Sequence, residues 1–130
     1  FQEGIAMKEI KTNNAPAALG PYSQGIIMGS TVFTSGQVGI NPANGEVAPD
    51  IEGQARQVLQ NVKAVLEAGG AKMEDVVKTS VFVKNMDDFA KVNEIYAEFF
   101  TEPYPARSCV EVARLPKDML VEIEAIAELK

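Results

Sequence analysis

The sequence predicts a single α/β (α+β) domain in which two helices pack against one mixed sheet. The length of 130 residues suits one domain, and a hydrophobic content of 46% with 23% charged residues is ordinary for a globular protein. Two segments, 51–68 and 86–100, carry apolar side chains at helical spacing. Each segment lies between β-rich segments, and this order calls for βαβ crossovers on one sheet.

The chain begins with a short leader and a long loop. Residues 1–6 read as a foreign leader because Met7 is suited to be the natural start, so the predicted domain covers residues 7–130. Residues 8–11 form an extended segment. Residues 12–25 follow as a loop rich in Asn, Pro and Gly, and a structured loop of that length is usually functional.

A hairpin follows the loop. Two β-forming segments, 26–28 and 31–33, flank Gly29-Ser30 and predict a type II′ turn between two strands. Residues 35–39 continue as a glycine-punctuated strand, and residues 41–45 form a turn.

The two predicted helices have recognisable ends. Asp50 is suited to cap the first helix, which Gly69-Gly70 stops. Asn85 is expected to cap the second helix, which Pro103 and Pro105 end. The apolar stripes consist of Ile51, Ala55, Val58, Leu59, Val62, Val65 and Leu66 in the first helix, and of Met86, Phe89, Val92, Tyr96, Phe99 and Phe100 in the second.

Three further strands complete the sheet. Residues 76–83 are rich in β-branched side chains, and residues 106–112 and 120–129 are two final strands separated by a turn at 115–118. If both helices cover the same face, the other face of the sheet is left bare. Oligomerisation is then the natural way to cover it.

The composition excludes several functions. The chain has no His, so Ser-His-Asp and Cys-His nucleophile systems are absent, and acid–base chemistry falls to a carboxylate, Tyr, Lys, Cys or bound water. The net charge of −6, with Lys and Arg spread singly, makes a nucleic-acid partner a poor prediction. The single Cys109 has no intrachain disulfide partner, which favours the reducing cytoplasm. No apolar run approaches the ~18–20 residues that span a bilayer, so no membrane partner is expected.

No motif indicates a cofactor or a metal. No Gly-x-Gly-x-x-Gly opens a helix, no Gly-Lys-Ser/Thr occurs, and no pair of Cys residues has metal-ligand spacing. We therefore expect neither.

Two strands carry the residues best suited to chemistry. Arg107, Cys109 and Glu111 share one face of their strand, and the Arg107 guanidinium offers a donor fork for a carboxylate or a phosphate. A structural ion pair is the alternative. Glu122 and Glu124 share a face of the last strand. They form either a solvated surface or a cleft in which one Glu, with a raised pKa, acts on water; spacing cannot choose between the two.

Four other residues are weaker candidates. Cys109 is either a nucleophile or a small buried side chain, and no His is present to activate it. Ser35 adjoins Gly36, where the backbone can approach a ligand closely, but a plain turn serine is the alternative. Tyr22 is either a cleft wall or a packing anchor. Asn93 lies four residues after Phe89, and so beside it on the second helix.

Several stretches together resemble one family. They are Gly20-Pro21-Tyr22-Ser23-Gln24-Gly25, Ser35-Gly36-Gln37, Pro42 with Gly45-Glu46, and Pro105-Ala106-Arg107-Ser108-Cys109-Val110-Glu111-Val112-Ala113-Arg114-Leu115 continuing to Val121-Glu122-Ile123. This pattern is similar to the reactive intermediate deaminase A (RidA, YjgF) family, over essentially residues 7–130.

The resemblance implies a fold, an assembly and an activity. Members of the family are homotrimers of chorismate-mutase-like α/β subunits, each with two helices on one face of its sheet. The sheets form a barrel-like core, and active clefts lie between subunits. They hydrolyse enamines and imines such as 2-aminoacrylate and 2-iminobutyrate to 2-keto acids and ammonia, without a cofactor.

The resemblance also implies roles for single residues. Arg107 matches the Arg that holds the substrate carboxylate, and Glu122 matches the Glu that orients or activates water. Pocket-lining positions of the family match Tyr22, Ser35, Asn93 and Cys109. Cys109 is expected to contribute mainly through its backbone.

Three rival functions remain open. The first is a trimer that binds small 2-keto or amino acids without catalysis, which would need Arg107 but not Glu122. The second is a ribonuclease or translation inhibitor, which an acidic chain without His makes physically weak. The third is a related amidase or a chorismate-mutase-like enzyme.

Overall fold

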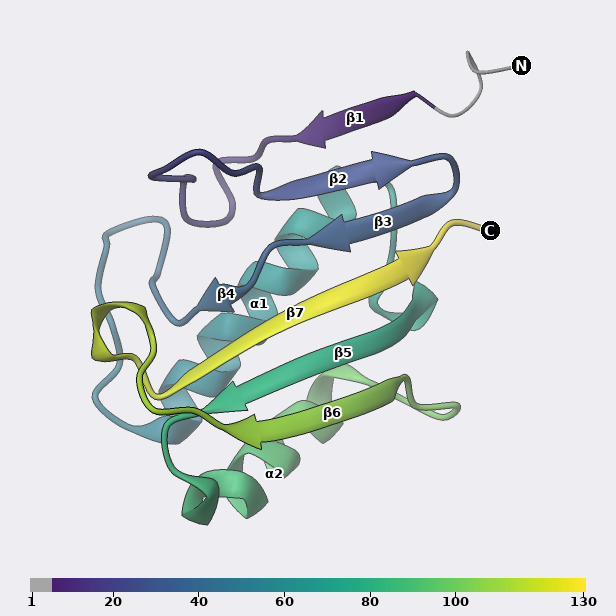
Figure 1. Ribbon diagram of the computed structural model, residues 1–130. Helices are drawn as coiled ribbons and strands as arrows, with labels where there is room; N and C mark the ends of the chain where they lie inside the picture. The colour runs from purple at the N-terminus through teal and green to yellow at the C-terminus, as the bar shows by residue number, and fades with distance from the viewer. Residues whose placement is uncertain (1–5) are drawn as a thin grey trace.

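The computed structural model describes residues 6–130 and shows a sheet with two helices behind it (Figure 1). Most of the expected leader, residues 1–5, lies outside the described residues. The helices are α1 (Ile51–Ala68) and α2 (Phe89–Phe99). The strands are β1 (Met7–Ile10), β2 (Gly25–Met28), β3 (Thr31–Thr34), β4 (Gln37–Val38), β5 (Val76–Val83), β6 (Ala106–Glu111) and β7 (Val121–Glu128).

The sheet is mixed, as predicted. Its strand order is β1-β2-β3-β7-β5-β6, and β4 also pairs with β7 beyond the end of β3. The pair β5–β6 is parallel and is connected by α2, whereas the other pairs are antiparallel. Since β4 and β5 flank β7 and both run antiparallel to it, α1 also forms a βαβ crossover.

The first helix begins and ends as predicted. The Asp50 side chain accepts a hydrogen bond from the Gly53 N–H at 3.1 Å. At the other end Gly70 has φ 88°, the Gly70 N–H bonds the Glu67 carbonyl at 3.0 Å, and the Ala71 N–H bonds the Leu66 carbonyl at 2.9 Å. These two bonds are a Schellman motif, which only a residue tolerant of positive φ closes without strain.

The predicted cap of the second helix is wrong in its position. Asn85 caps a 3₁₀ turn at Met86–Asp88 by accepting from the Asp87 N–H at 2.9 Å, and α2 begins only at Phe89. The Met86 N–H donates to the Glu111 side chain at 2.8 Å, which attaches this turn to the end of β6. In residues 6–130 neither helix is both long enough and apolar enough to cross a membrane.

Alternation along β7 separates the two faces of the sheet. Val121, Ile123, Ala125 and Ala127 are buried beneath the helices. Between them lie Glu122, Glu124, Ile126 and Glu128, which point to the opposite face.

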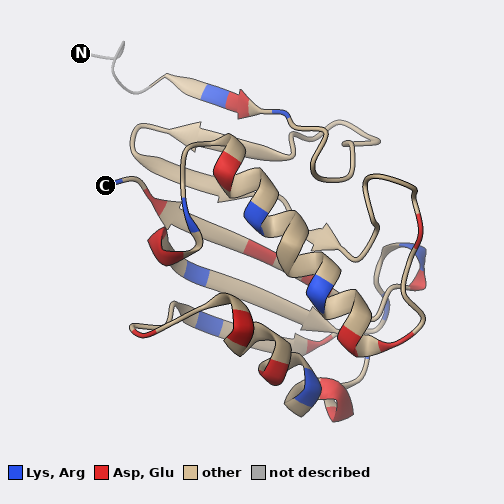
Figure 2. Ribbon diagram, turned by 180° about the vertical axis from the view of Figure 1, so that it is seen from behind, with Lys and Arg blue, Asp and Glu red and all other residues tan. Residues whose placement is uncertain are grey.

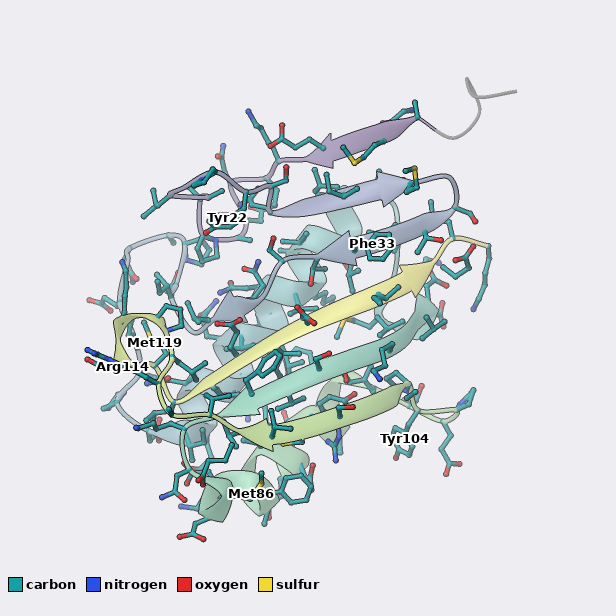
Figure 3. All side chains as sticks on the ribbon, viewed as in Figure 1. Tyr22, Phe33, Met86, Tyr104, Arg114 and Met119 are labelled. Atoms are coloured by element: carbon teal, nitrogen blue, oxygen red, sulfur yellow. The ribbon has the colours of Figure 1, made fainter. Side chains whose placement is uncertain are left out.

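Both helices cover the same face, so the other face is bare, as predicted (Figures 1 and 2). We call it the open face. Its large side chains include exposed Met28, Phe33 and Val110, and half-buried Phe82 and Ile126. Phe33 is labelled in Figure 3. Glu124, Ser80 and Lys78 lie on the same face among these side chains. Large exposed apolar side chains on an uncovered sheet face are typical of an interface.

The long loop that precedes β2 is held by one buried amide. Gln24 accepts from the Thr12 N–H at 2.8 Å and donates to the carbonyls of Thr12 at 3.0 Å, Ala15 at 3.3 Å and Pro16 at 2.8 Å. Its side chain is buried. One side chain therefore satisfies four backbone groups of a loop that cannot use a strand ladder.

We expect Gln24→Ala to lower the free energy of unfolding by about 2–3 kcal/mol, because it leaves buried loop carbonyls without donors. Denaturant unfolding followed by circular dichroism, at one protein concentration, measures the change. The exposed Gln60 is the matched control, and Gln60→Ala should change stability by less than about 0.5 kcal/mol. Equal stability of the two variants would contradict the role of Gln24.

Candidate active site

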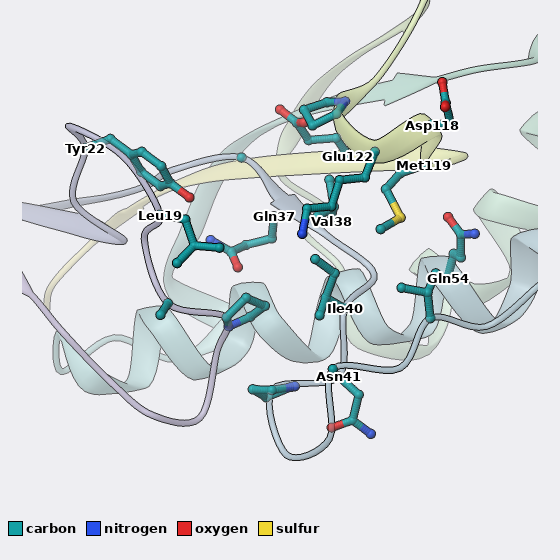
Figure 4. Close-up of a pocket in the computed structure, with 18 residues that line it drawn as sticks. Leu19, Tyr22, Gln37, Val38, Ile40, Asn41, Gln54, Asp118, Met119 and Glu122 are labelled. Carbon is teal, nitrogen blue, oxygen red and sulfur yellow. The ribbon is translucent and has the colours of Figure 1, made fainter.

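A broad cleft with a volume of about 690 Å³ lies at the end of the sheet where β4 meets β7 (Figure 4). Its walls come from the long loop, the segment after β4, the turn at 116–118 and β7. The residues labelled in Figure 4 are Leu19, Tyr22, Gln37, Val38, Ile40, Asn41, Gln54, Asp118, Met119 and Glu122. The cleft thus combines apolar walls with a few polar groups, which is typical of a small-molecule site.

Glu122 is the half-buried carboxylate of this cleft. Burial raises the pKa of its carboxyl above the usual range, and the charge of Glu124 adds to the rise. Glu124, two residues further along β7, is exposed. The structure thus distinguishes the two glutamates, which the sequence could not, since only Glu122 lines the cleft. A carboxylate with a raised pKa is suited to accept a proton near neutral pH.

Tyr22 and Ser35 lie close to the same cleft. The Tyr22 side chain is exposed and contributes to the cleft wall. The Ser35 hydroxyl donates to the Ser23 carbonyl at 2.5 Å, and the Ser35 N–H donates to the Gln24 carbonyl at 2.9 Å. Ser35 therefore holds the loop that carries Tyr22.

Arg107 lies on β6 and packs against α2. Its Nη1 donates to Asn93 Oδ1 at 2.8 Å. Its guanidinium carbon is 5.4 Å from the ring centre of Phe89 and 4.9 Å from that of Tyr96. The Tyr96 hydroxyl is held in turn by Thr79 at 2.7 Å. One amide and two rings thus orient the fork, with further N–H donors left for an anion.

Sequence reasoning missed Phe89 and Tyr96 as neighbours of Arg107 and assigned both to the helix core. The signal was present in their spacing, because Phe89, Asn93 and Tyr96 recur at i, i+4 and i+7 and so share one helix face. What the spacing could not show is that this face packs on β6 at Arg107.

Cys109 lies two residues after Arg107 on the same face of β6 and is half-buried. Burial raises the pKa of its thiol, and the charge of Arg107 offsets part of the rise. The thiol is therefore protonated at neutral pH, which favours a packing role over a nucleophilic one.

The candidate residues form two groups that do not meet within the chain. Arg107 pairs with Thr79 on β5, and Glu122 pairs with Phe82 on the same strand, so three residues and two strand spacings separate them. Their Cα atoms are about 14 Å apart, given ~4.8 Å between strands and ~3.3 Å per residue. Arg107 faces the helices, whereas Glu122 points to the open face. We call these groups the Arg107 half-site and the Glu122 half-site.

The described residues 6–130 contain no cluster of three or more His, Cys, Asp or Glu side chains arranged to bind a metal ion. What the half-sites offer instead is an oriented cation and a desolvated carboxylate. A small α+β protein with these two features is suited to bind a small anionic molecule and to transfer a proton.

The chain belongs to the YjgF/RidA family. The family described as Endoribonuclease L-PSP matches residues 12–129. A protein of Salmonella typhimurium named 2-iminobutanoate/2-iminopropanoate deaminase is 62% identical over 123 residues, which cover 92% of this chain and 96% of that protein. A RutC family protein of Pyrococcus horikoshii is 58% identical over 93% of this chain and 98% of its own length.

Solved structures have the same fold. The crystal structure of the YjgF gene product from Escherichia coli matches with a TM-score of 0.91 and 59% identity, over 95% of this chain and 99% of that one. The crystal structure of E. coli TdcF with bound serine matches with a TM-score of 0.91 and 52% identity, over the same shares of the two chains. These similarities confirm the predicted α+β fold and family.

Proposed function

We propose that the chain is a cofactor-independent deaminase that hydrolyses small 2-imino acids, such as 2-iminobutyrate and the imine of 2-aminoacrylate, to 2-keto acids and ammonia. The observation that carries the proposal is the presence of an oriented Arg107 and a half-buried Glu122 in a chain 61–62% identical to proteins named 2-iminobutanoate/2-iminopropanoate deaminase.

Arg107 is proposed to bind the substrate carboxylate. Asn93 and the rings of Phe89 and Tyr96 hold its guanidinium before any ligand arrives. A bidentate pair between a guanidinium and a carboxylate would fix both the position and the rotation of the imine carbon.

Glu122 is proposed to activate water. Its carboxylate takes a proton from water as the water oxygen bonds to the imine carbon, and returns this proton to the imine nitrogen. Glu122 then takes the hydroxyl proton of the resulting carbinolamine and delivers it to the amino nitrogen as the C–N bond breaks, which releases ammonia and leaves the 2-keto acid. Since an imine carbon is already electrophilic, one well-placed base suffices, and a chain without His can perform this chemistry.

The two half-sites are proposed to meet between subunits of a homotrimer whose sheets form a barrel-like core. Two features support this assembly: the apolar side chains of the open face, and the separation of Arg107 from Glu122 within one chain. Each site would then take the Arg107 half-site from one subunit and the Glu122 half-site from its neighbour. We also place the protein in the cytoplasm, where a free Cys109 remains reduced.

A coupled assay tests the activity. An amino-acid oxidase generates imines in situ from several amino acids, and keto-acid release is timed with and without the protein. Faster release with the protein supports the deaminase. Tight binding of 2-keto or amino acids without faster release would instead favour a binding trimer, a candidate that the bound serine in TdcF keeps in view.

The family description names an endoribonuclease, but the charges of this chain do not favour RNA as a partner. The chain has a net charge of −6, and its Lys and Arg residues are scattered over the ribbon rather than gathered (Figure 2). Several are paired with carboxylates, as in Arg56–Glu98, Arg114–Asp118 and Lys130–Asp75. Salt-dependent binding of RNA would contradict this view.

The raised pKa of Glu122 predicts the pH dependence of the reaction. A general base must be ionised, so kcat/KM should rise with pH through a midpoint above the ordinary Glu value of 4.5. Glu124→Gln removes the neighbouring charge, which should move this midpoint to lower pH while the rate at neutral pH is kept. A pH–rate profile of both proteins measures the shift; identical midpoints would contradict the coupling.

A further inference from the structure

Strands β3 and β4 contain one residue more than the stretch of β7 that they face. Phe33 pairs with Ile126 and Gln37 pairs with Ile123, so four steps on one side are matched by three on the other. The extra residue falls within Thr34–Gly36, which we call the bulge. A β-bulge bends its strand and redirects side chains, and bulges are frequent beside active sites.

The bulge is anchored by hydrogen bonds that lie outside the ordinary ladder. The Thr34 hydroxyl accepts from the Ala125 N–H at 3.0 Å. Ser35 turns its N–H and hydroxyl to the loop carbonyls of Gln24 and Ser23. The bulge is thus attached to β7 on one side and to the Tyr22 loop on the other, which makes it a defined element rather than a gap in pairing.

Gly36 is the residue of the bulge on which the Glu122 side chain rests. A Cβ atom built on Gly36 would lie 2.8 Å from the Glu122 carboxyl carbon and 3.1 Å from its Cγ, and closer still to its Oε2. Real Cβ contacts are almost never this short, so any side chain at position 36 would displace the carboxylate. Both residues line the same cleft.

We infer that the bulge, through Gly36, is the positioning element for Glu122: it sets where the carboxylate lies and how far it is removed from water. This inference rests on the proposed deaminase function and deepens it. Gly36 does not touch substrate in this account and acts only through Glu122. The Glu122 carboxylate lies against the backbone of Gly36, which shields it from water on that side. This shielding contributes to the burial that raises the pKa of Glu122.

The test is Gly36→Ala. We expect kcat to fall about 10- to 100-fold with a small change in KM, because the base is displaced by about 1 Å while the Arg107 half-site is untouched. The midpoint of the pH profile should fall as the displaced carboxylate gains water. Gly20→Ala is the matched control, since a Cβ there meets only the Tyr22 ring at 3.7 Å.

A double-mutant cycle shows whether Gly36 acts through Glu122. In a Glu122→Gln background, Gly36→Ala should cause no further loss of kcat. Losses that multiply would overturn the inference, and so would an unchanged kcat and pH midpoint in Gly36→Ala. If Gly36→Ala folds poorly, Glu122→Ala and Gly36→Ala/Glu122→Ala are compared instead: equal stability supports the contact, and a less stable double variant overturns it.

An NMR titration separates this inference from the proposed function. With ¹³C-labelled glutamate, the Glu122 carboxyl is identified by its loss in Glu122→Gln and titrated without any substrate. A lower midpoint in Gly36→Ala than in the unsubstituted protein supports the inference even if the chain hydrolyses no imine. An unchanged midpoint overturns it even if the chain is a deaminase.

Discussion

Arg107→Ala is expected to lower kcat/KM for 2-iminobutyrate by about 100- to 1000-fold, the loss usual for removing one partner of a charged, hydrogen-bonded pair. Asn93, Phe89 and Tyr96 hold the guanidinium in place, and the substitution removes the proposed partner of the substrate carboxylate. The loss should appear in both KM and kcat, because the anchor also orients the imine carbon. Initial rates from the oxidase-coupled assay, over a range of imine concentrations, measure it.

Two variants show whether charge or geometry is responsible. Arg107→Lys keeps the charge but loses the planar fork and the stacking, so it should recover only part of the activity. Arg56→Ala removes an exposed guanidinium that pairs with Glu98 and should leave the rate unchanged. Retention of most of the activity in Arg107→Ala would remove the carboxylate clamp from the mechanism.

Glu122→Gln is expected to reduce kcat by about 100- to 10,000-fold, the range typical of losing a general base, with little change in KM. The amide keeps the size of the side chain but cannot accept the proton from water. Rapid sampling of keto-acid formation at saturating imine provides kcat. A Gln variant that turns over like the unsubstituted protein would show that the water is activated elsewhere.

The same variant should be more stable at neutral pH. Because the pKa of Glu122 is raised in the folded protein, the folded state binds more protons than the unfolded state between the two pKa values, and stability falls as pH rises through this window. At pH 7 the ionised, half-buried carboxylate therefore lowers stability, and Gln removes this effect. Thermal unfolding at pH 7 and at pH 4 tests the sign, since the gain should shrink at the lower pH.

Mixing the two inactive variants tests where the half-sites meet. If each site takes Arg107 from one subunit and Glu122 from another, co-assembly of Arg107→Ala and Glu122→Gln chains rebuilds about one quarter of the sites. Activity should then return on unfolding and refolding the variants together, but not on mixing refolded oligomers. If both residues act from one chain, mixed assemblies stay inactive.

The sequence predicted the elements well because its signals are local. The spacing of apolar residues that predicts α1 lies within the helix itself. Asp50 and Gly69-Gly70, which mark its two ends, lie within one turn of those ends. Strand parity correctly placed Glu122 and Glu124 on one face of β7. The prediction that Asn85 caps the second helix was wrong because an Asn caps a 3₁₀ turn with the same local hydrogen bond that begins an α-helix.

The arrangement of the site was beyond local signals. Parity alone says which residues share a face of one strand, but not which face the helices cover, so the opposite directions of Arg107 and Glu122 could not be seen. The bulge at Thr34–Gly36 depends on pairing between residues about 90 positions apart. In the sequence, a glycine is the only sign of the extra residue.

The positions of the tyrosines give the protein a built-in optical reporter. The chain has no Trp and three Tyr residues, of which Tyr22 lies at the Glu122 half-site, Tyr96 lies beneath Arg107 and Tyr104 is exposed outside both. Its near-ultraviolet absorption and emission therefore arise mainly from rings at the two halves of the site. Ligand entry can be followed by tyrosine fluorescence without any label, and Tyr22→Phe and Tyr104→Phe would separate the signal of each ring.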